Sequence, residues 1–484
     1  MKRRWWFSLI ALVVFLSLAG SFGSKTPGAH AAPEIKAAEA KTPLTSLGGK
    51  RFLENETGPL RLRGIIGYLM ILGLCYLVST NRDKVRWRTV GWAVGLQVIF
   101  ALIVLNPVVG QFFFNNVDTG VRKLLGFADE GIGFLFQSTS PHKMTYEPSP
   151  GAPLVTELFV GRMSPALKSV AFSVLPTVIF FSSLITLLYH LGVMQLVVRG
   201  MARAMAYMLG TSGAESLSCT ANIFVGQTEA PLLVKPFIGK MTQSELMAVM
   251  TGGFATVAGG ILAIYVGLLG GIKGIAGHLV TASLMAAPAA LGVAKLMMPE
   301  TEEAVTAGKV DADVERPDTN AIEAAARGAS EGMTLVLNIA AMLVAFVAIV
   351  AMINALLGIF GLRLEELLGW ILSPLAFMMG VPWKEATKIG ELLGKKLVLT
   401  ELLAYLGLKD MLGAAQPVLS ARSAVIASYS LCGFANVASI GIQIGGIGAM
   451  APERRGDLAR LGLRAMFAGA LVSCMSGTIA GLLV

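Results

Sequence analysis

Long apolar segments alternate with short polar turns along most of the chain. A helix needs about 20 apolar residues to cross roughly 30 Å of hydrocarbon, because each residue advances it by about 1.5 Å. The segments that meet this requirement are residues 61–80, 90–108, 167–193, 248–269, 280–298, 333–360, 425–450 and 461–484. The pattern therefore predicts an all-α polytopic membrane protein with about eight transmembrane helices.

The first 32 residues have the three parts of a secretory signal peptide. Residues 1–4 are basic, residues 5–20 are apolar, and residues 29–32 are small enough for cleavage, apart from one histidine. The alternative is a retained first helix, although about 16 apolar residues are few for a span. In both cases the polar segment 33–60 is expected to begin outside the membrane.

Charge and composition narrow the class of protein. Hydrophobic residues make up 55% of the chain and charged residues 14%, whereas a soluble domain is about 25% charged. The net charge of +9 does not predict a nucleic-acid partner, because the cations gather in short turns such as 81–88 and 452–464. Basic turns of this kind lie on the cytoplasmic side. We therefore expect a multi-pass protein of a cell inner (plasma) membrane.

Three segments are predicted to lie beside the membrane rather than across it. Residues 194–209 form an amphipathic helix on the inner side, and residues 111–137 form a similar helix on the outer side. Residues 299–327 are acidic and poor in apolar side chains, so they are expected to form a cytoplasmic linker.

An internal repeat is the most informative feature of the sequence. Residues 253–258 read Gly-Phe-Ala-Thr-Val-Ala and residues 433–438 read Gly-Phe-Ala-Asn-Val-Ala, each in the middle of an apolar segment. Thr228-Glu229 precedes the first copy and Thr400-Glu401 precedes the second. Paired, interrupted apolar segments indicate the binding site of a transporter, because a broken helix survives in a membrane only inside protein or beside a water-filled cavity.

The first interrupted segment, residues 213–240, is too polar to span and predicts a re-entrant helical hairpin with its tip at residues 225–228. Its polar side chains are Asn222, Gln227, Thr228 and Glu229. A carboxylate at membrane depth is costly and marks a functional site by default. The alternative is a helix-packing cluster in which Glu229 pairs with Lys235.

The second interrupted segment runs over residues 384–408 and contains Glu401. The broken span that follows it supplies Asn436 and Ser439, which share one helix face. These three side chains can accept and donate hydrogen bonds to a sugar diol. The alternative is a set of satisfied polar groups in the core.

These residues resemble the concentrative nucleoside transporter family. The resemblance rests on residues 222–233, 394–405 and 432–436 and on the basic turn 81–88, and it extends over residues 61–484. It implies a homotrimer that imports nucleosides by elevator-type alternating access, driven by a cation gradient. It also implies scaffold helices in residues 61–193 and 328–380, and hairpins and transport helices in residues 194–298 and 381–484.

The resemblance also implies roles for individual residues. The nucleoside would be bound by Gly226, Gln227, Thr228, Glu229, Ile261, Glu401, Phe434, Asn436 and Ser439. A sodium ion would be bound by Asn222, Thr256 and the carbonyl groups of Val225 and Val257. The family usually has Asn where this chain has Thr400, so ribose geometry can differ here.

The sequence thus predicts a sodium-coupled nucleoside symporter in the lipid bilayer, with no cofactor besides the coupling ion and no enzymatic activity. Proton coupling through Glu229 and transport of another small polar solute stay open as alternatives. An intramembrane enzyme would need a nucleophile with a base or a metal cluster, and the sequence has no HExxH or GxSxG motif. A receptor without flux has no evident need for two matched broken helices.

Overall fold

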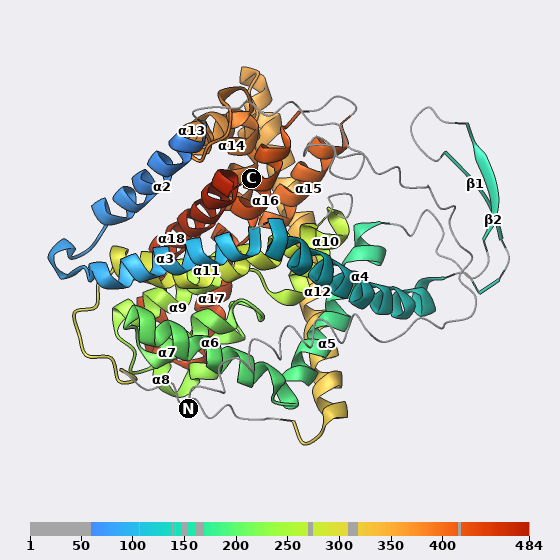
Figure 1. The fold of residues 1–484 in the computed structure, drawn as a ribbon. Coiled ribbons are helices and arrows are strands. Elements are labelled where there is room, and N and C mark those ends of the chain that lie inside the picture. The colour runs from blue at the N-terminus through green and yellow to red at the C-terminus, as the bar shows by residue number, and fades with distance from the viewer. Residues whose placement is uncertain are drawn as a thin grey trace.

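The computed structural model describes residues 60–105, 107–137, 139–140, 142–147, 153–159, 169–269, 274–307, 318–414 and 418–483. These residues are mostly helical (Figure 1), which confirms the predicted all-α class. The predicted signal segment 1–32 and the external segment 33–60 lie outside the described residues, apart from Leu60.

The N-terminal half contains α2 (Leu60–Leu77), α3 (Trp87–Leu105), α4 (Pro107–Phe136), β1 (His142–Tyr146), β2 (Val155–Phe159), α5 (Thr177–His190), α6 (Val193–Leu209), α7 (Gly213–Ala221), α8 (Lys235–Ile238), α9 (Gln243–Ala255), α10 (Gly259–Leu268) and α11 (Ile275–Met297). The C-terminal half contains α12 (Ala321–Leu357), α13 (Leu364–Met378), α14 (Trp383–Val398), α15 (Glu401–Gly413), α16 (Ala421–Leu431), α17 (Val437–Met450) and α18 (Arg455–Leu483).

Six helical spans of the described residues are long and apolar enough to cross a membrane, and a seventh results if the bent pair α13–α14 counts as one span. The predicted segments 61–80 and 425–450 contain shorter apolar helices, at Arg63–Leu77 and Val437–Met450. The number of about eight transmembrane helices therefore stays a prediction.

The non-spanning segments differ from the predictions in detail. The amphipathic helices are present as α6 and α4, and α4 begins directly after α3. Residues 321–327 are predicted to belong to the linker, as part of an acidic segment poor in apolar side chains, but they form the first turns of α12, which Asn320 caps with its side chain. The Arg327 guanidinium donates to both carboxylate oxygens of Asp318 and holds the pKa of that carboxyl below its usual range.

A short antiparallel hairpin, β1–β2, extends from the helical body beyond α4 (Figure 1). It pairs His142 with Phe159 at one end and Tyr146 with Val155 at the other. Sequence reasoning missed it because both strands are only five residues long and lie between apolar segments that suggest helices.

The helices around α9–α11 and the pair α5–α12 differ sharply in how much of their surface is buried. Helix α3 packs along α11, α2 packs along α18, and α5 packs along α12. In α11 and in the α9–α10 segment, 89% of the most apolar stretch is buried. The corresponding value is 17% for the segment that contains α12. The interrupted α9–α10 segment therefore lies in the interior of the protein, where its free backbone groups can find partners.

Candidate functional site

Two broken helices meet at their breaks. The α9–α10 segment is interrupted at residues 256–258 and the α16–α17 segment at residues 432–436, so each copy of the sequence repeat contains a break. Gly433 has a φ of +127°, and a Cβ there would lie 2.7 Å from the Phe254 carbonyl oxygen. Only glycine permits this backbone conformation at such close approach. The repeat therefore places two unwound segments side by side.

Each broken helix is preceded by a helical hairpin. Hairpin 1 (residues 213–240) begins with α7, turns at residues 222–229 and continues as a 3₁₀ helix from Ala230 to Val234. Hairpin 2 (residues 383–413) consists of α14 and α15, with its tip at Leu399 and Thr400. The Thr400 side chain accepts a hydrogen bond from the Leu403 amide and caps α15. Thr400 thus supplies the capping oxygen at this tip.

The tip of hairpin 1 lies against both broken helices. The Phe224 carbonyl oxygen accepts a hydrogen bond from the Gly259 amide, the first residue of α10, over 3.0 Å. On the other side, Thr228 packs against Gly446 of α17. Residues 225–228 are thereby held between the two interrupted spans, as predicted for a hairpin tip.

One polar cluster joins hairpin 1 to α17. Gln443 of α17 donates from Nε2 to Gln227 Oε1 over 3.0 Å and to the Met250 carbonyl oxygen over 3.2 Å. Gln443 is fully buried and Gln227 is 7% exposed. Sequence reasoning missed Gln443, although a lone amide seven residues after Asn436 in an apolar helix marks the same face.

A second polar cluster joins hairpin 2 to α17. Glu401 Oε1 accepts a hydrogen bond from the Tyr265 hydroxyl, and Oε2 accepts one from Asn436 Nδ2, both over 2.8 Å. Asn436 Oδ1 in turn accepts from the Ser439 amide and caps α17. The structure therefore brings together Glu401, Asn436 and Ser439 and adds Tyr265, which the sequence did not single out.

The two clusters are spaced along one face of α17. Asn436 and Gln443 are separated by seven residues, which is roughly 10 Å along a helix that rises 1.5 Å per residue. Ile261 lies one turn before Tyr265 on α10 and is 5% exposed, so it borders the second cluster. Phe434 is half-buried at the break beside Gly433.

Glu229 has accessible surface although protein atoms surround it on most sides. Thr228 Oγ1 donates to its Oε1 over 3.3 Å. Among the contacts of the described residues, no ion pair joins Glu229 to Lys235. Glu229 immediately precedes the second arm of hairpin 1, so its side chain lies at the tip of the hairpin. The alternative interpretation, a helix-packing cluster in which Glu229 pairs with Lys235, therefore lacks its ion pair.

The four residues expected to bind sodium flank the junction between hairpin 1 and α10. Asn222, Val225, Thr256 and Val257 are all buried. In the described part of the chain, Asn222 Oδ1 is a buried acceptor without a hydrogen-bond donor. The Thr256 hydroxyl donates to the Gly252 carbonyl oxygen over 2.9 Å, which leaves its oxygen lone pairs free. Neutral oxygen ligands of this kind suit a hard cation.

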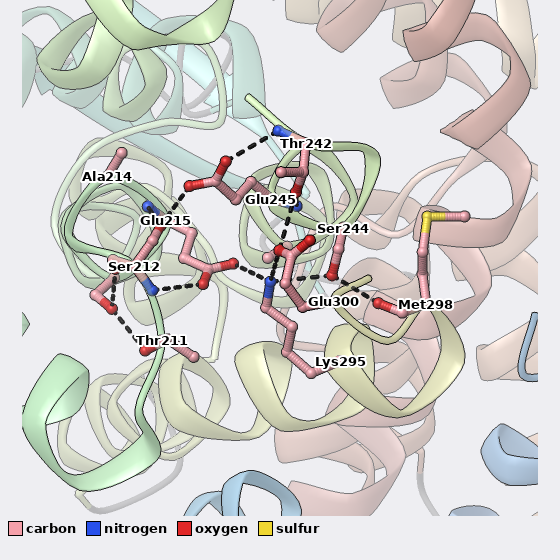
Figure 2. A network of polar contacts seen from close by, with 12 residues as sticks. Thr211, Ser212, Ala214, Glu215, Thr242, Ser244, Glu245, Lys295, Met298 and Glu300 are labelled. Atoms are coloured by element: carbon pink, nitrogen blue, oxygen red, sulfur yellow. Dashed lines mark hydrogen bonds and ion pairs between the residues drawn. The ribbon is translucent and has the colours of Figure 1, made fainter. Parts of the chain in front are cut away.

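A charged network at the base of hairpin 1 was not predicted (Figure 2). Lys295 Nζ lies 2.8 Å from Glu215 Oε2 and 2.9 Å from Glu300 Oε2. Glu215 and Glu245 each close a capping box, with Ser212 and Thr242 respectively. The network could have been found from the Ser-x-x-Glu pattern at residues 212–215 and the Thr-x-x-Glu pattern at residues 242–245, which mark helix starts.

The linker after α11 closes over this base network. Thr306 accepts hydrogen bonds from the free amides at the start of α7: its carbonyl oxygen from Gly213 over 3.0 Å, and its hydroxyl from Ala214 over 3.1 Å. A cavity of about 490 Å³ lies beneath the linker and is lined by Arg86, Ser212, Glu215 and Lys295 among others. The linker is therefore hydrogen-bonded to the N-terminal end of hairpin 1.

Paired hairpins, each followed by a broken helix inside a membrane-spanning body, define a secondary transporter rather than an enzyme. Comparisons with known proteins agree. Residues 66–139 and 278–481 match the families described as the N-terminus and the C-terminus of Na+ dependent nucleoside transporters, and residues 171–272 match one described as nucleoside recognition. The chain belongs to the concentrative nucleoside transporter family.

Relatives of this chain are found in bacteria and in mammals. An uncharacterized transporter of Bacillus subtilis, YutK, is 43% identical over 432 residues, covering 87% of this chain and 99% of its own length. Sodium/nucleoside cotransporter 1 of Mus musculus is 38% identical, covering 89% of this chain and 65% of its own length.

The structure of CNTnw in an inward-facing, substrate-bound state has a TM-score of 0.76 and 40% identity, covering 88% of this chain and 98% of that one. A variant of CNTnw in an intermediate state has a TM-score of 0.77 and 41% identity, covering 87% and 99%. A variant in an outward-facing state has a TM-score of 0.76 and 39% identity, covering 88% and 98%.

Proposed function

We propose that this protein is a sodium-coupled symporter that imports nucleosides across a bacterial inner membrane. The observation that carries the proposal is the pair of polar clusters on one face of α17, roughly 10 Å apart. Glu401 and Asn436 form one cluster, and Gln227 and Gln443 form the other. This spacing matches a solute with a hydroxyl-rich end and a hydrogen-bonding planar end.

The two clusters have different chemistry. An ionised Glu401 offers only acceptors, and a ribose diol offers two donors, so Glu401 together with Asn436 and Ser439 would hold the sugar. Gln227, Thr228, Gly226 and Glu229 at the tip of hairpin 1 would face the nucleobase. Ile261 and Phe434 would supply apolar contacts to the rings.

Coupling would come from a cation bound by Asn222, Thr256 and the carbonyl oxygens of Val225 and Val257. The unpartnered Asn222 Oδ1 supports this role. A nucleoside is neutral, so a co-transported cation must supply the driving force, about 2.3 kcal/mol per 100 mV for each charge. The exposed carboxylate of Glu229 supports the second candidate, a proton-coupled importer.

Alternating access would move the hairpins and broken helices as one unit against α5 and α12. Dense burial of α9–α11 and sparse burial of α12 support this division. CNTnw has been solved in inward-facing, intermediate and outward-facing states. Large apolar side chains such as Leu337 and Val344 are exposed on α12, which is consistent with contact between copies in a homotrimer.

Uptake of labelled uridine into proteoliposomes tests the proposal. With an inward sodium gradient we expect transient accumulation above the equilibrium level, and unlabelled nucleosides should compete. A proton gradient without sodium is the control for the second candidate. No uptake of any nucleoside under either gradient would reject nucleoside transport and leave another small polar solute as the cargo.

A further inference from the structure

Gln443 is a buried amide in α17 to which the proposed function assigns no direct contact with solute. It has no exposed surface and lies between the tip of hairpin 1 and α9. Gly253 of α9 makes room for it: a Cβ there would lie 2.8 Å from Gln443 Nε2 and 2.9 Å from Gln227 Cβ. Glycine at this first position of the repeat therefore leaves the space that the two glutamine side chains occupy.

The hydrogen bonds of Gln443 determine how both amides are oriented. The Met250 carbonyl oxygen can only accept, so the Gln443 atom 3.2 Å from it must be the amino group. The same amino group lies 3.0 Å from Gln227, so the Gln227 atom there must be its carbonyl oxygen. An amide carries its oxygen and its amino group on opposite sides. The Gln227 amino group therefore faces away from Gln443.

We propose that Gln443 is a positioning residue that makes Gln227 present a hydrogen-bond donor to the nucleobase. The inference rests on the proposed function and adds a selectivity to it. Uridine and inosine carry a keto oxygen at the position where cytidine and adenosine carry an amino group, so they would be preferred if Gln227 contacts that position.

The arrangement also orients the solute. At the other end of α17, Glu401 receives hydrogen bonds from Tyr265 and Asn436 and offers acceptors to the sugar. At this end, Gln227 offers a donor. Uridine has hydroxyl donors on its ribose and keto acceptors on its base, so it satisfies both ends in one orientation only.

Two substitutions at Gln443 test the inference in proteoliposomes with saturating sodium. Gln443→Glu keeps the shape but places an oxygen beside Gln227, which reverses the Gln227 amide. Gln443→Met keeps the side-chain volume but cannot donate a hydrogen bond to Gln227, so the orientation of the Gln227 amide is no longer fixed. Gln97→Met is the matched control, because Gln97 of α3 is another fully buried glutamine, hydrogen-bonded to Tyr68 of α2 and Ser476 of α18.

The measured quantity is the ratio of kcat/KM for labelled uridine to that for labelled cytidine. One amide hydrogen bond corresponds to roughly tenfold, so the wild-type protein and Gln97→Met should favour uridine by about that factor. Gln443→Met should bring the ratio close to one, and Gln443→Glu should reverse it. A ratio that both Gln443 variants leave unchanged would overturn the inference, as would a wild-type preference for cytidine. Absence of uptake of both nucleosides by the wild type would instead reject the proposed function.

Discussion

The α5–α12 pair and the body built around the two hairpins solve different physical problems. In the segments containing α5 and α12, 22% and 17% of the most apolar stretch is buried, against 89% for α11. The pair presents apolar side chains outward, where lipid or another copy of the chain can cover them. The body instead buries acids, amides and hydroxyls, each of which needs a partner. Changes of the same chemical type should therefore cost much more in the body than in the pair.

The largest expected effect is on stability, from Lys295→Met. This change leaves Glu215 and Glu300 without their buried cation, and breaking a buried ion pair costs roughly 3–5 kcal/mol. Arg327→Met in α12 is the comparison, because Arg327 is 40% exposed in its ion pairs and exposed pairs contribute about 1 kcal/mol or less. Thermal unfolding in detergent measures both. Equal losses of stability would contradict the contrast between body and pair.

Glu401→Gln should have the next largest effect, on uptake. The substitution removes the charge that strengthens hydrogen bonds to both ribose hydroxyls, about 3 kcal/mol in total, or roughly a hundredfold loss of uridine uptake. Glu366→Gln, at an exposed position of α13, should leave uptake unchanged. Initial rates at equal amounts of reconstituted protein provide the measurement, and normal accumulation by Glu401→Gln would refute the role of Glu401.

Gly433→Ala should have an intermediate effect. An added Cβ would approach the Phe254 and Ala255 carbonyl oxygens to 2.7 and 2.9 Å and separate the two breaks, so uptake should fall roughly tenfold or more, about 1.4 kcal/mol. Gly361→Ala is the partner experiment after α12, because Gly361 also has a positive φ but faces open space. Its uptake should stay close to that of the wild type, since strain there does not reach the breaks. Parallel losses of uptake in both variants would show that backbone strain, rather than the crossing of the breaks, is responsible.

The smallest effect on transport is expected from Leu337→Ser with Val344→Ser. Both residues are exposed in α12, at 62% and 74%, so the apparent affinity for uridine should change less than about twofold, or 0.4 kcal/mol. Chemical crosslinking in membranes should nevertheless show a smaller oligomeric fraction. Leu69→Ser, on the exposed face of α2, is the control. An oligomeric fraction that does not change would exclude this α12 face from the subunit contact.

Patterns along the sequence predicted the helical class and the position of the tip of hairpin 1, because helix breaks require glycine, proline or capping side chains that are visible in the sequence. The repeat also marked the breaks at Gly433 and Thr256. It could not reveal that the two breaks touch, since that contact depends on packing between distant segments. Long-range partners such as Tyr265 for Glu401 and Lys295 for Glu215 were hidden for the same reason.

The sequence also did not show that the acids of the two hairpins differ in exposure. Glu229 and Glu401 follow a threonine in each half and look equivalent, yet Glu401 is 6% exposed and Glu229 is exposed. The difference arises because Glu401 begins a helix that faces Tyr265, whereas Glu229 ends the turn at the tip of hairpin 1, where Thr228 donates to it.

A comparison of uridine with 3′-deoxyuridine tests most directly whether hairpin 2 holds the sugar of a nucleoside. Binding of each compound to the wild type and to Glu401→Gln is measured calorimetrically in saturating sodium. We predict that loss of the hydroxyl weakens binding to the wild type roughly tenfold and hardly affects binding to the variant, because the acceptor is already impaired. An equal penalty in both proteins would show that Glu401 does not contact the ribose.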